Sequence, residues 1–132
     1  MTNSPSVEAT PPSSLPRYTG AILRLEGAIV ALAAGFGFQA LDGSWLWFAV
    51  LFLAPDLSML GYLRGNRVGA AIYNAAHTYL APATLAAWGV TGGSVPALHV
   101  AALWTAHIGA DRLCGYGLKE PTGFKHTHLQ RV

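Results

Sequence analysis

Charged residues are scarce in this chain of 132 residues. Asp, Glu, Lys and Arg together make up 11% of it, whereas hydrophobic residues make up 52%. Soluble domains carry about 25% charged residues, so a water-facing surface is hard to assemble from this composition. The shortage of charge argues against an ordinary soluble domain and indicates an integral membrane protein.

Cysteine and net charge are also low. The single cysteine, Cys114, has no partner for an internal disulfide and is most simply explained as a small apolar helix residue. The net charge of +2 is too small for a nucleic-acid-binding surface. We therefore expect no disulfide framework and no nucleic acid among the partners.

What the chain does have is long apolar runs. Each is about 20 residues long, which is the length that spans the hydrocarbon core of a bilayer, and together they cover 21–41, 45–63, 68–90 and 96–115. We predict an all-α fold, a bundle of four transmembrane helices over 21–115. The Ser-, Pro- and Thr-rich residues 1–20 are expected to form a disordered leader, and 116–132 a cytoplasmic interfacial tail.

The basic residues predict the orientation of these spans. They occur near the start of the chain, between the second and third runs, and at or after the end of the fourth: Arg17, Arg24, Arg64, Arg67, Arg112, Lys119, Lys125 and Arg131. Loops rich in Lys and Arg stay on the cytoplasmic side, so both termini are predicted to be cytoplasmic. The lipid bilayer is then the first expected partner.

Two features of the runs bear on helix packing. Gly27, Ala31 and Gly35 repeat every four residues, a small-residue stripe that allows another helix to approach closely, in this chain or in a homo-oligomer. Pro55 lies inside the second run, where it removes a backbone hydrogen bond and is expected to bend the helix beside Asp56.

Ionisable residues in the runs lie at one predicted depth. With about 1.5 Å of rise per residue, Glu26, Asp56, His77, His107 and Asp111 all lie within roughly 6–15 Å of the cytoplasmic ends of their spans. His107 and Asp111 are four residues apart and share a helix face. Such groups are costly in an apolar segment, so they mark a candidate site that opens to the cytoplasm.

A metal centre is one interpretation of this site. The imidazoles of His77 and His107 and the carboxylates of Asp56 and Asp111 form a ligand set suited to zinc, manganese or iron. His126 and His128 of the tail could complete it. The pattern is only moderately specific, since the chain has no HExxH or CxxC motif.

Metal-free acid–base catalysis is the other interpretation. Asp56 and Asp111 would titrate apart in a dry pocket, one as acid and one as base, with His107 as a further catalytic group. Side chains that could orient a substrate oxygen are Tyr73, Asn74 and Arg112. Candidate substrate-binding side chains are Glu26, Tyr62 and Tyr116. A purely structural polar network that holds the four helices together is a third explanation of the same residues.

Several blocks of the chain resemble an uncharacterised bacterial family of small integral membrane proteins, domain of unknown function four-two-six-zero. The similar blocks are LRLEG (23–27), PDLSMLGYL (55–63), GAAIYNAAH (69–77), WTAHIGADRLCGYGLK (104–119) and FKHTHL (124–129). The resemblance covers nearly everything after the leader. It implies a four-helix protein of the bacterial inner (cytoplasmic) membrane and no particular chemistry.

These observations lead to one functional hypothesis and two rivals. We expect a membrane-embedded enzyme, of hydrolase, cyclase or isomerase type, whose polar pocket faces the cytosol and acts on a lipophilic or amphipathic small molecule. The rivals are a small ion- or proton-coupled transporter and a structural or partner-binding membrane subunit.

Overall fold

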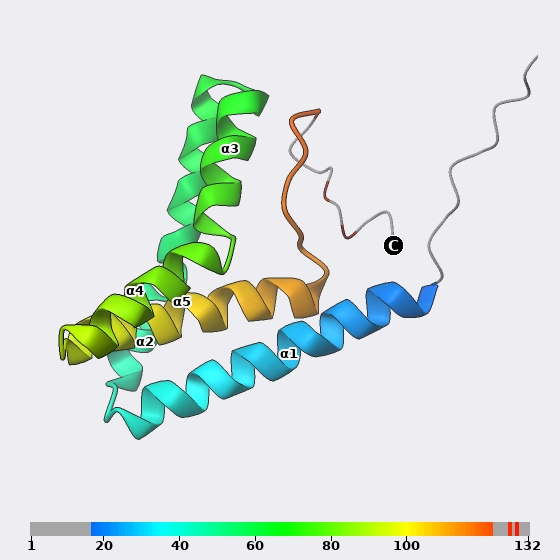
Figure 1. Ribbon diagram of the computed structural model, residues 1–132. Helices are drawn as coiled ribbons and strands as arrows, with labels where there is room; N and C mark the ends of the chain where they lie inside the picture. Colours follow the sequence, from blue (N-terminus) through cyan, green and yellow to red (C-terminus); the bar gives the residue numbers. More distant parts are fainter. Residues whose placement is uncertain (1–16, 123–126, 128, 130–132) are drawn as a thin grey trace, which may run out of the picture.

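The regular elements of the protein are helices. The computed structural model describes residues 17–122, 127 and 129 (Figure 1). Its helices are α1 (Arg17–Ala40), α2 (Trp45–Leu51), the 3-10 helix η1 (Ala54–Arg64), α3 (Asn66–Ala76), α4 (Leu80–Thr91) and α5 (Val95–Cys114). An isolated bridge pairs Lys119 with Thr127. The all-α prediction is confirmed for this part of the chain. Helix α1 begins at Arg17, so residues 17–20, which we had assigned to the leader, are helical.

Helices α1 and α5 pack side by side through small residues (Figure 1). A methyl group placed on Gly109 of α5 would lie 2.7 Å from both the amide nitrogen of Ala31 and the carbonyl oxygen of Gly27. The two backbones therefore meet with no room for a side chain between them. The predicted stripe is confirmed at Gly27 and Ala31 as a contact within the chain, whereas Gly35 faces open space.

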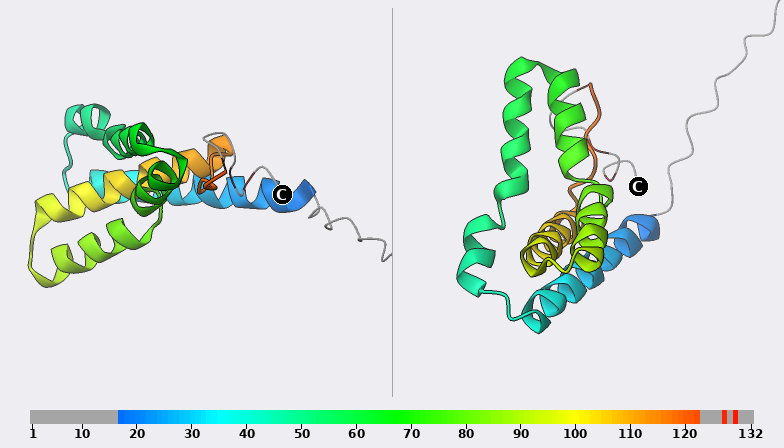
Figure 2. Two further views of the ribbon diagram at one scale, coloured as in Figure 1. Left: turned by 90° about the horizontal axis from the view of Figure 1, so that it is seen from above. Right: turned by 60° about the vertical axis from the view of Figure 1, so that its left-hand side comes forward.

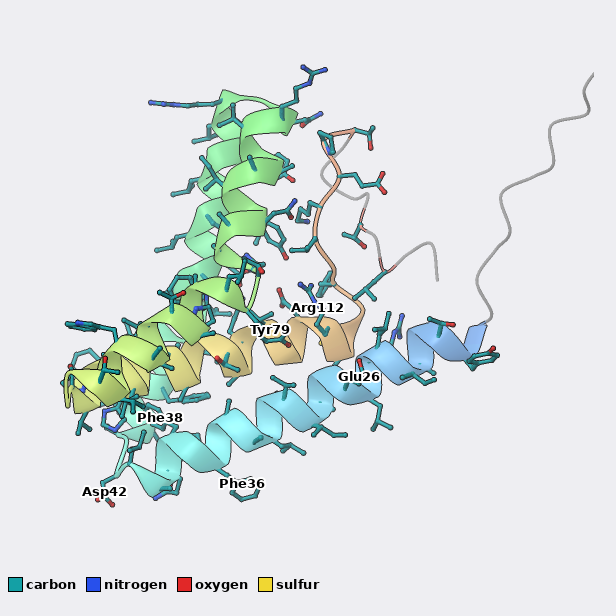
Figure 3. The ribbon with its side chains drawn as sticks, in the orientation of Figure 1. Glu26, Phe36, Phe38, Asp42, Tyr79 and Arg112 are labelled. Carbon is teal, nitrogen blue, oxygen red and sulfur yellow. The ribbon has the colours of Figure 1, made fainter. Side chains whose placement is uncertain are left out.

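The outer face of α1 is apolar. Large side chains repeat along it every three or four residues and are exposed: Ile22, Leu25, Ile29, Leu32 and Phe36. Figure 3 shows Phe36 pointing away from α5, while Phe38, which is buried, points toward it. This periodicity separates one face that packs on α5 from one whose large apolar side chains are exposed.

The second apolar run, 45–63, contains the predicted bend. Helix α2 ends at Leu51, and the chain continues as the 3-10 helix η1 with Pro55 in its first turn. Proline has no amide hydrogen for a ladder bond, so the α-helix cannot continue unchanged through this position. The bend places Asp56 in the first turn of η1.

The third run, 68–90, is divided into α3 and α4. Pro82 cannot donate a hydrogen bond to the carbonyl of Thr78, and its ring would clash with that carbonyl in a continuous α-helix. The chain therefore turns at His77, which caps α3. The two helices have 11 and 12 residues, so each is about 16–18 Å long, shorter than the roughly 30 Å hydrocarbon core.

The break divides the molecule into two parts, which meet near His77. Helix α4 packs on α5 beside α1, while η1 and α3 form a hairpin that stands away from these three helices (Figures 1 and 2). Two stretches, Tyr18–Ala40 and Trp45–Arg64, are long and apolar enough to cross a membrane. The structure thus supports a helical protein with two candidate spans.

Candidate metal centre

Two histidines and two aspartates meet where the hairpin joins α5. His77 Nε2 lies 3.5 Å from Asp56 Oδ1 and 3.6 Å from Asp111 Oδ2. His107 Nε2 lies 3.6 Å and 3.8 Å from the same two oxygens. The two imidazole nitrogens are 3.3 Å apart. The predicted convergence of these side chains is confirmed as geometry, while their chemical roles stay predictions.

Each ligand position follows from a local feature of the chain. Asp56 lies in the first turn of η1 directly after Pro55, and His77 caps α3 where the chain turns toward α4. His107 and Asp111 are one turn apart on α5, so their side chains share a face. A proline bend, a helix end and one regular helix face therefore form the cluster.

The spacing of the four atoms suits a metal ion. Zinc bound by histidine and carboxylate has metal–ligand distances of about 2.0–2.2 Å, and a tetrahedron of that size has edges of about 3.3–3.6 Å. The five distances given above run from 3.3 to 3.8 Å, and all four atoms lie within 4.8 Å of one another. This group could therefore hold a metal ion with little rearrangement.

Neighbouring groups orient the ligands. His77 Nδ1 lies 2.9 Å from the carbonyl oxygen of Tyr73, which can only accept, so this nitrogen carries the proton and leaves Nε2 free to bind a cation. The Tyr73 ring stacks on the His77 ring, with centroids 3.7 Å apart, and its hydroxyl donates to Asp111 Oδ2 at 3.3 Å. Tyr73 thus supports two of the four ligands.

His107 is positioned by packing instead. Its ring meets the Phe52 ring edge to face at 5.2 Å, and its Nδ1 is buried without a hydrogen-bond partner in the described part of the chain. The two histidine side chains are 0% and 2% exposed, whereas the carboxylates of Asp56 and Asp111 keep 29% and 18% exposure. Two carboxylates also balance the charge of a divalent ion. The accessible side of the cluster is thus its acidic side.

Two of the predicted catalytic side chains bond to the backbone instead. Arg112 donates to the carbonyl oxygens of His77, at 2.9 Å, and of Tyr116, at 2.8 Å. The guanidinium therefore braces the end of α3. Asn74 forms a pair of bonds with the backbone of Lys119, at 2.7 Å and 2.9 Å, and so ties the tail to α3.

The structure does not bring the predicted substrate-binding side chains into the cluster. Glu26 is exposed on α1, where Figure 3 shows it on the neighbouring helix, and Tyr116 is exposed after α5. The ring of Tyr62 lies against Gly69 of α3. The other two proposed ligands, His126 and His128, lie outside the described residues.

Lys119 is a member of the site region that the sequence pattern did not indicate. Its ammonium nitrogen lies 4.8 Å from the centroid of the Tyr73 ring. Burial lowers the pKa of Lys119, and the carboxylates of Asp111 and Asp56 oppose that shift. A cation is thus held beside the acidic side of the cluster. The Asn74 bonds tie the Lys119 backbone to α3, and a long-range bond of this kind has no sequence signature.

The comparisons with known proteins give a family and no function. A search of the curated proteins and a search of the solved structures found no match to the chain. A family model described as "Domain of unknown function (DUF4260)" matches residues 20–132, which includes all four cluster residues. The chain therefore belongs to the DUF4260 family.

Proposed function

We propose that the protein is a membrane-embedded, metal-dependent hydrolase that acts on an amphipathic ester. The observation that carries the proposal is the close grouping of the potential ligand atoms of His77, His107, Asp56 and Asp111, all within 4.8 Å of one another. Zinc is the favoured ion because mixed imidazole and carboxylate ligands at this spacing suit it, with manganese and iron as the alternatives.

The apolar surface supports the membrane part of the proposal. Exposed large apolar residues form the outer stripe of α1 and continue over α2 and η1. Helix α1 is one of the two stretches long enough to cross a bilayer, and α2 together with η1 is the other. Contiguous apolar surface of this extent marks contact with a membrane or a partner. We place α1 and the Trp45–Arg64 stretch in the inner membrane, with both termini on the cytoplasmic side, as the basic residues predict.

The cluster suits hydrolysis through its accessible acidic side. His77, His107 and one of the two aspartates would hold a divalent ion, which would supply a Lewis acid and a water that ionises near neutral pH. Hydrolysis forms a bond from the water oxygen to the ester carbonyl carbon and breaks the bond from this carbon to the alcohol oxygen, which gives an acid and an alcohol. The aspartate that does not hold the ion, Asp56 or Asp111, would accept the water's proton and return it to the alcohol oxygen, and Lys119 would attract an anionic headgroup.

Metal analysis combined with an activity assay tests the proposal. We expect protein purified in detergent to carry about one zinc, manganese or iron per chain, and to hydrolyse long-chain esters in a metal-dependent way. No stoichiometric metal, even after reconstitution with each ion, would exclude the metal centre. Loss of turnover in Asp56→Asn and Asp111→Asn without any metal would then favour acid–base chemistry.

A bound metal without hydrolysis would favour a different function. Structural zinc sites are closed by four protein ligands, and this cluster offers four. These four come from η1, α3 and α5, and the hairpin of η1 and α3 otherwise meets α5 over a small area. In that case the protein is a structural or partner-binding subunit. A transporter would require polar groups that continue through the half of the spans away from the cytoplasm. The histidine predicted in that half, His99, uses its Nε2 in a bond to the carbonyl oxygen of Leu41, which does not favour a transporter.

A further inference from the structure

An apolar cavity adjoins the metal cluster. Its volume is about 370 Å³, within the range of roughly 300–1,000 Å³ typical of small-molecule sites. The lining comes from the same segments that supply the ligands, and includes Ala54, Pro55, Ser58, Ala76, Leu103 and Trp104. Pro55 and Ala76 directly precede ligands in the chain, so the cavity and the cluster are neighbours.

The cavity and Lys119 lie on opposite sides of the cluster along α5. Leu103 and Trp104 come one turn before His107, whereas Asp111 comes one turn after it. Lys119 approaches Tyr73 on the Asp111 side. The four ligands therefore separate an apolar compartment from a polar one, as a site for an amphipathic molecule requires.

A buried hydroxyl in the cavity points to the kind of molecule that fits. Ser58 lines the cavity, and its Oγ is buried without a hydrogen-bond partner among the described residues. Pro55 and Ser58 are three residues apart on a 3-10 helix, so both face the cavity, with Asp56 next to Pro55. A purely hydrocarbon ligand would leave this hydroxyl unsatisfied, whereas a chain that ends in an ester group offers it an acceptor once the Ser58 side chain rotates into the cavity.

The cavity also opens on the surface. Its lining includes Leu51 and Val100, which are 39% and 44% exposed. Leu51 belongs to the Trp45–Arg64 stretch, one of the two candidate membrane spans. The hydrocarbon chain of a lipid in the bilayer can therefore enter the cavity without crossing water.

We propose that this cavity binds the hydrocarbon chain of a lipid ester, with the Ser58 hydroxyl donating to an oxygen of the ester group. This inference rests on the proposed function, because it places the ester beside the metal-bound water and the headgroup beside Lys119. It narrows the substrate class to acyl lipids.

Photolabelling of the full chain tests the inference independently of turnover. The probe is a long-chain fatty acid methyl ester that carries a diazirine in its chain, added to protein in detergent and in phosphatidylcholine vesicles. We expect the label on peptides that contain residues 51–58 and 100–104. Ala54→Phe, and separately Val100→Trp, should abolish that labelling. Ser58→Ala should weaken the affinity of the protein for the probe about tenfold or less.

The control and the metal content separate the two proposals. Ala87→Phe adds the same side chain at an exposed position of α4 and should leave labelling unchanged. Labelling spread evenly over the outer faces of α1 and α4, and insensitive to Ala54→Phe, would overturn the inference even if zinc is bound. Cavity-specific labelling of a protein that binds no metal would support the binding of a hydrocarbon chain in the cavity. It would overturn only the proposal of a metal-dependent hydrolase. Loss of a dimer in Ala54→Phe, with labelling unchanged, would make the cavity a subunit interface.

Discussion

The two histidines of the cluster are oriented by different means. His77 is fixed by a hydrogen bond from Nδ1 to the Tyr73 carbonyl and by the stacked Tyr73 ring. His107 relies on the edge of the Phe52 ring, and its Nδ1 has no partner in the part of the chain that the structure describes. Groups around a metal ligand hold it in place and raise its basicity, so His77 should be the stronger of the two ligands.

Replacing His107 tests the metal centre directly. In His107→Ala we expect the metal content to fall to background and the free energy of unfolding to fall with it, because an ion that binds only the folded protein stabilises it. The loss would be about 4 kcal/mol at a free-metal concentration near 1,000 times the dissociation constant. Metal analysis and thermal melting in detergent measure the two effects.

His99→Ala is the matched control for that change. His99 is a half-buried histidine of the same helix that bonds to the carbonyl oxygen of Leu41, outside the cluster. Its replacement should leave the metal content unchanged. Equal loss of metal in both variants would mean that general destabilisation, and not ligand removal, is responsible.

Tyr73→Phe probes the support around the ligands. The change removes the hydroxyl that donates to Asp111 Oδ2, but keeps the stacked ring and the backbone carbonyl that holds His77. Loss of such an outer contact typically weakens metal affinity about 10–100-fold, and we expect the lower end of that range. Competition with a chelator of known affinity measures it. An unchanged affinity would show that the 3.3 Å contact does not support Asp111.

At the scale of helices, the contact between α1 and α5 depends on the lack of side chains. In Gly109→Ala the new methyl group would meet the backbone of α1 at 2.7 Å, so we expect a loss of about 1–3 kcal/mol in the free energy of unfolding. In Gly35→Ala nothing lies within 4 Å, and helix propensity should raise stability by up to about 1 kcal/mol. Thermal melting of the pair measures both changes. Equal effects of the two substitutions would contradict the close approach.

The cluster lies at the junction between the hairpin of η1 and α3 and helix α5. The extensive helix contacts are α1 with α5, α4 with α5 and α3 with η1, so the hairpin meets α5 over a small area. The bonds at that junction include Trp104 Nε1 to the Ala76 carbonyl, at 2.7 Å, Arg112 to the His77 carbonyl, and the Tyr73 hydroxyl to Asp111 Oδ2. A metal held by residues of both parts would therefore be a main connection between them.

Removal of the metal should loosen this hairpin selectively. We expect amide hydrogens of α3 and η1 to exchange faster after chelation, while those of α1, which packs on α5 elsewhere, change little. Hydrogen exchange followed by mass spectrometry resolves the two regions. Uniform acceleration, or none, would mean that the cluster does not hold the hairpin.

The helices and the cluster could be predicted from the sequence to different extents. Apolar runs determine where helices lie, so α1 and α5 match their predicted ranges closely. The division of 68–90 was not predicted, because Pro82 can bend a helix or end it, and the packing of α4 on α5 decides between these. The cluster could be predicted because costly groups gather at one depth. The bonds of Arg112 and Asn74 could not, because they join residues 35 and 45 positions apart to backbone atoms.

At the scale of the whole molecule, topology stays a prediction that reporter fusions can test. A reporter active only in the cytoplasm should work after Arg67 and Val132, and one active only outside it after Leu41 and Gly93, because the basic loops stay inside. If α3 and α4 bend without crossing the bilayer, the fusion after Gly93 will behave as cytoplasmic. That result would contradict the prediction of four spans. The remaining candidate spans would be Tyr18–Ala40 and Trp45–Arg64.

The separation of the ligands along the chain orders the protein's biogenesis. His77 and His107 are 30 residues apart, and a ribosome adds about 5–20 residues per second, so about 1.5–6 s pass between the synthesis of His77 and that of His107. During that interval the nascent hairpin would carry an imidazole and a carboxylate without their partners, which in an inserting membrane protein favours a hydrated environment until α5 emerges. A metal held by all four residues would be acquired only after the last helix has been synthesised, so metallation would be a late step in maturation.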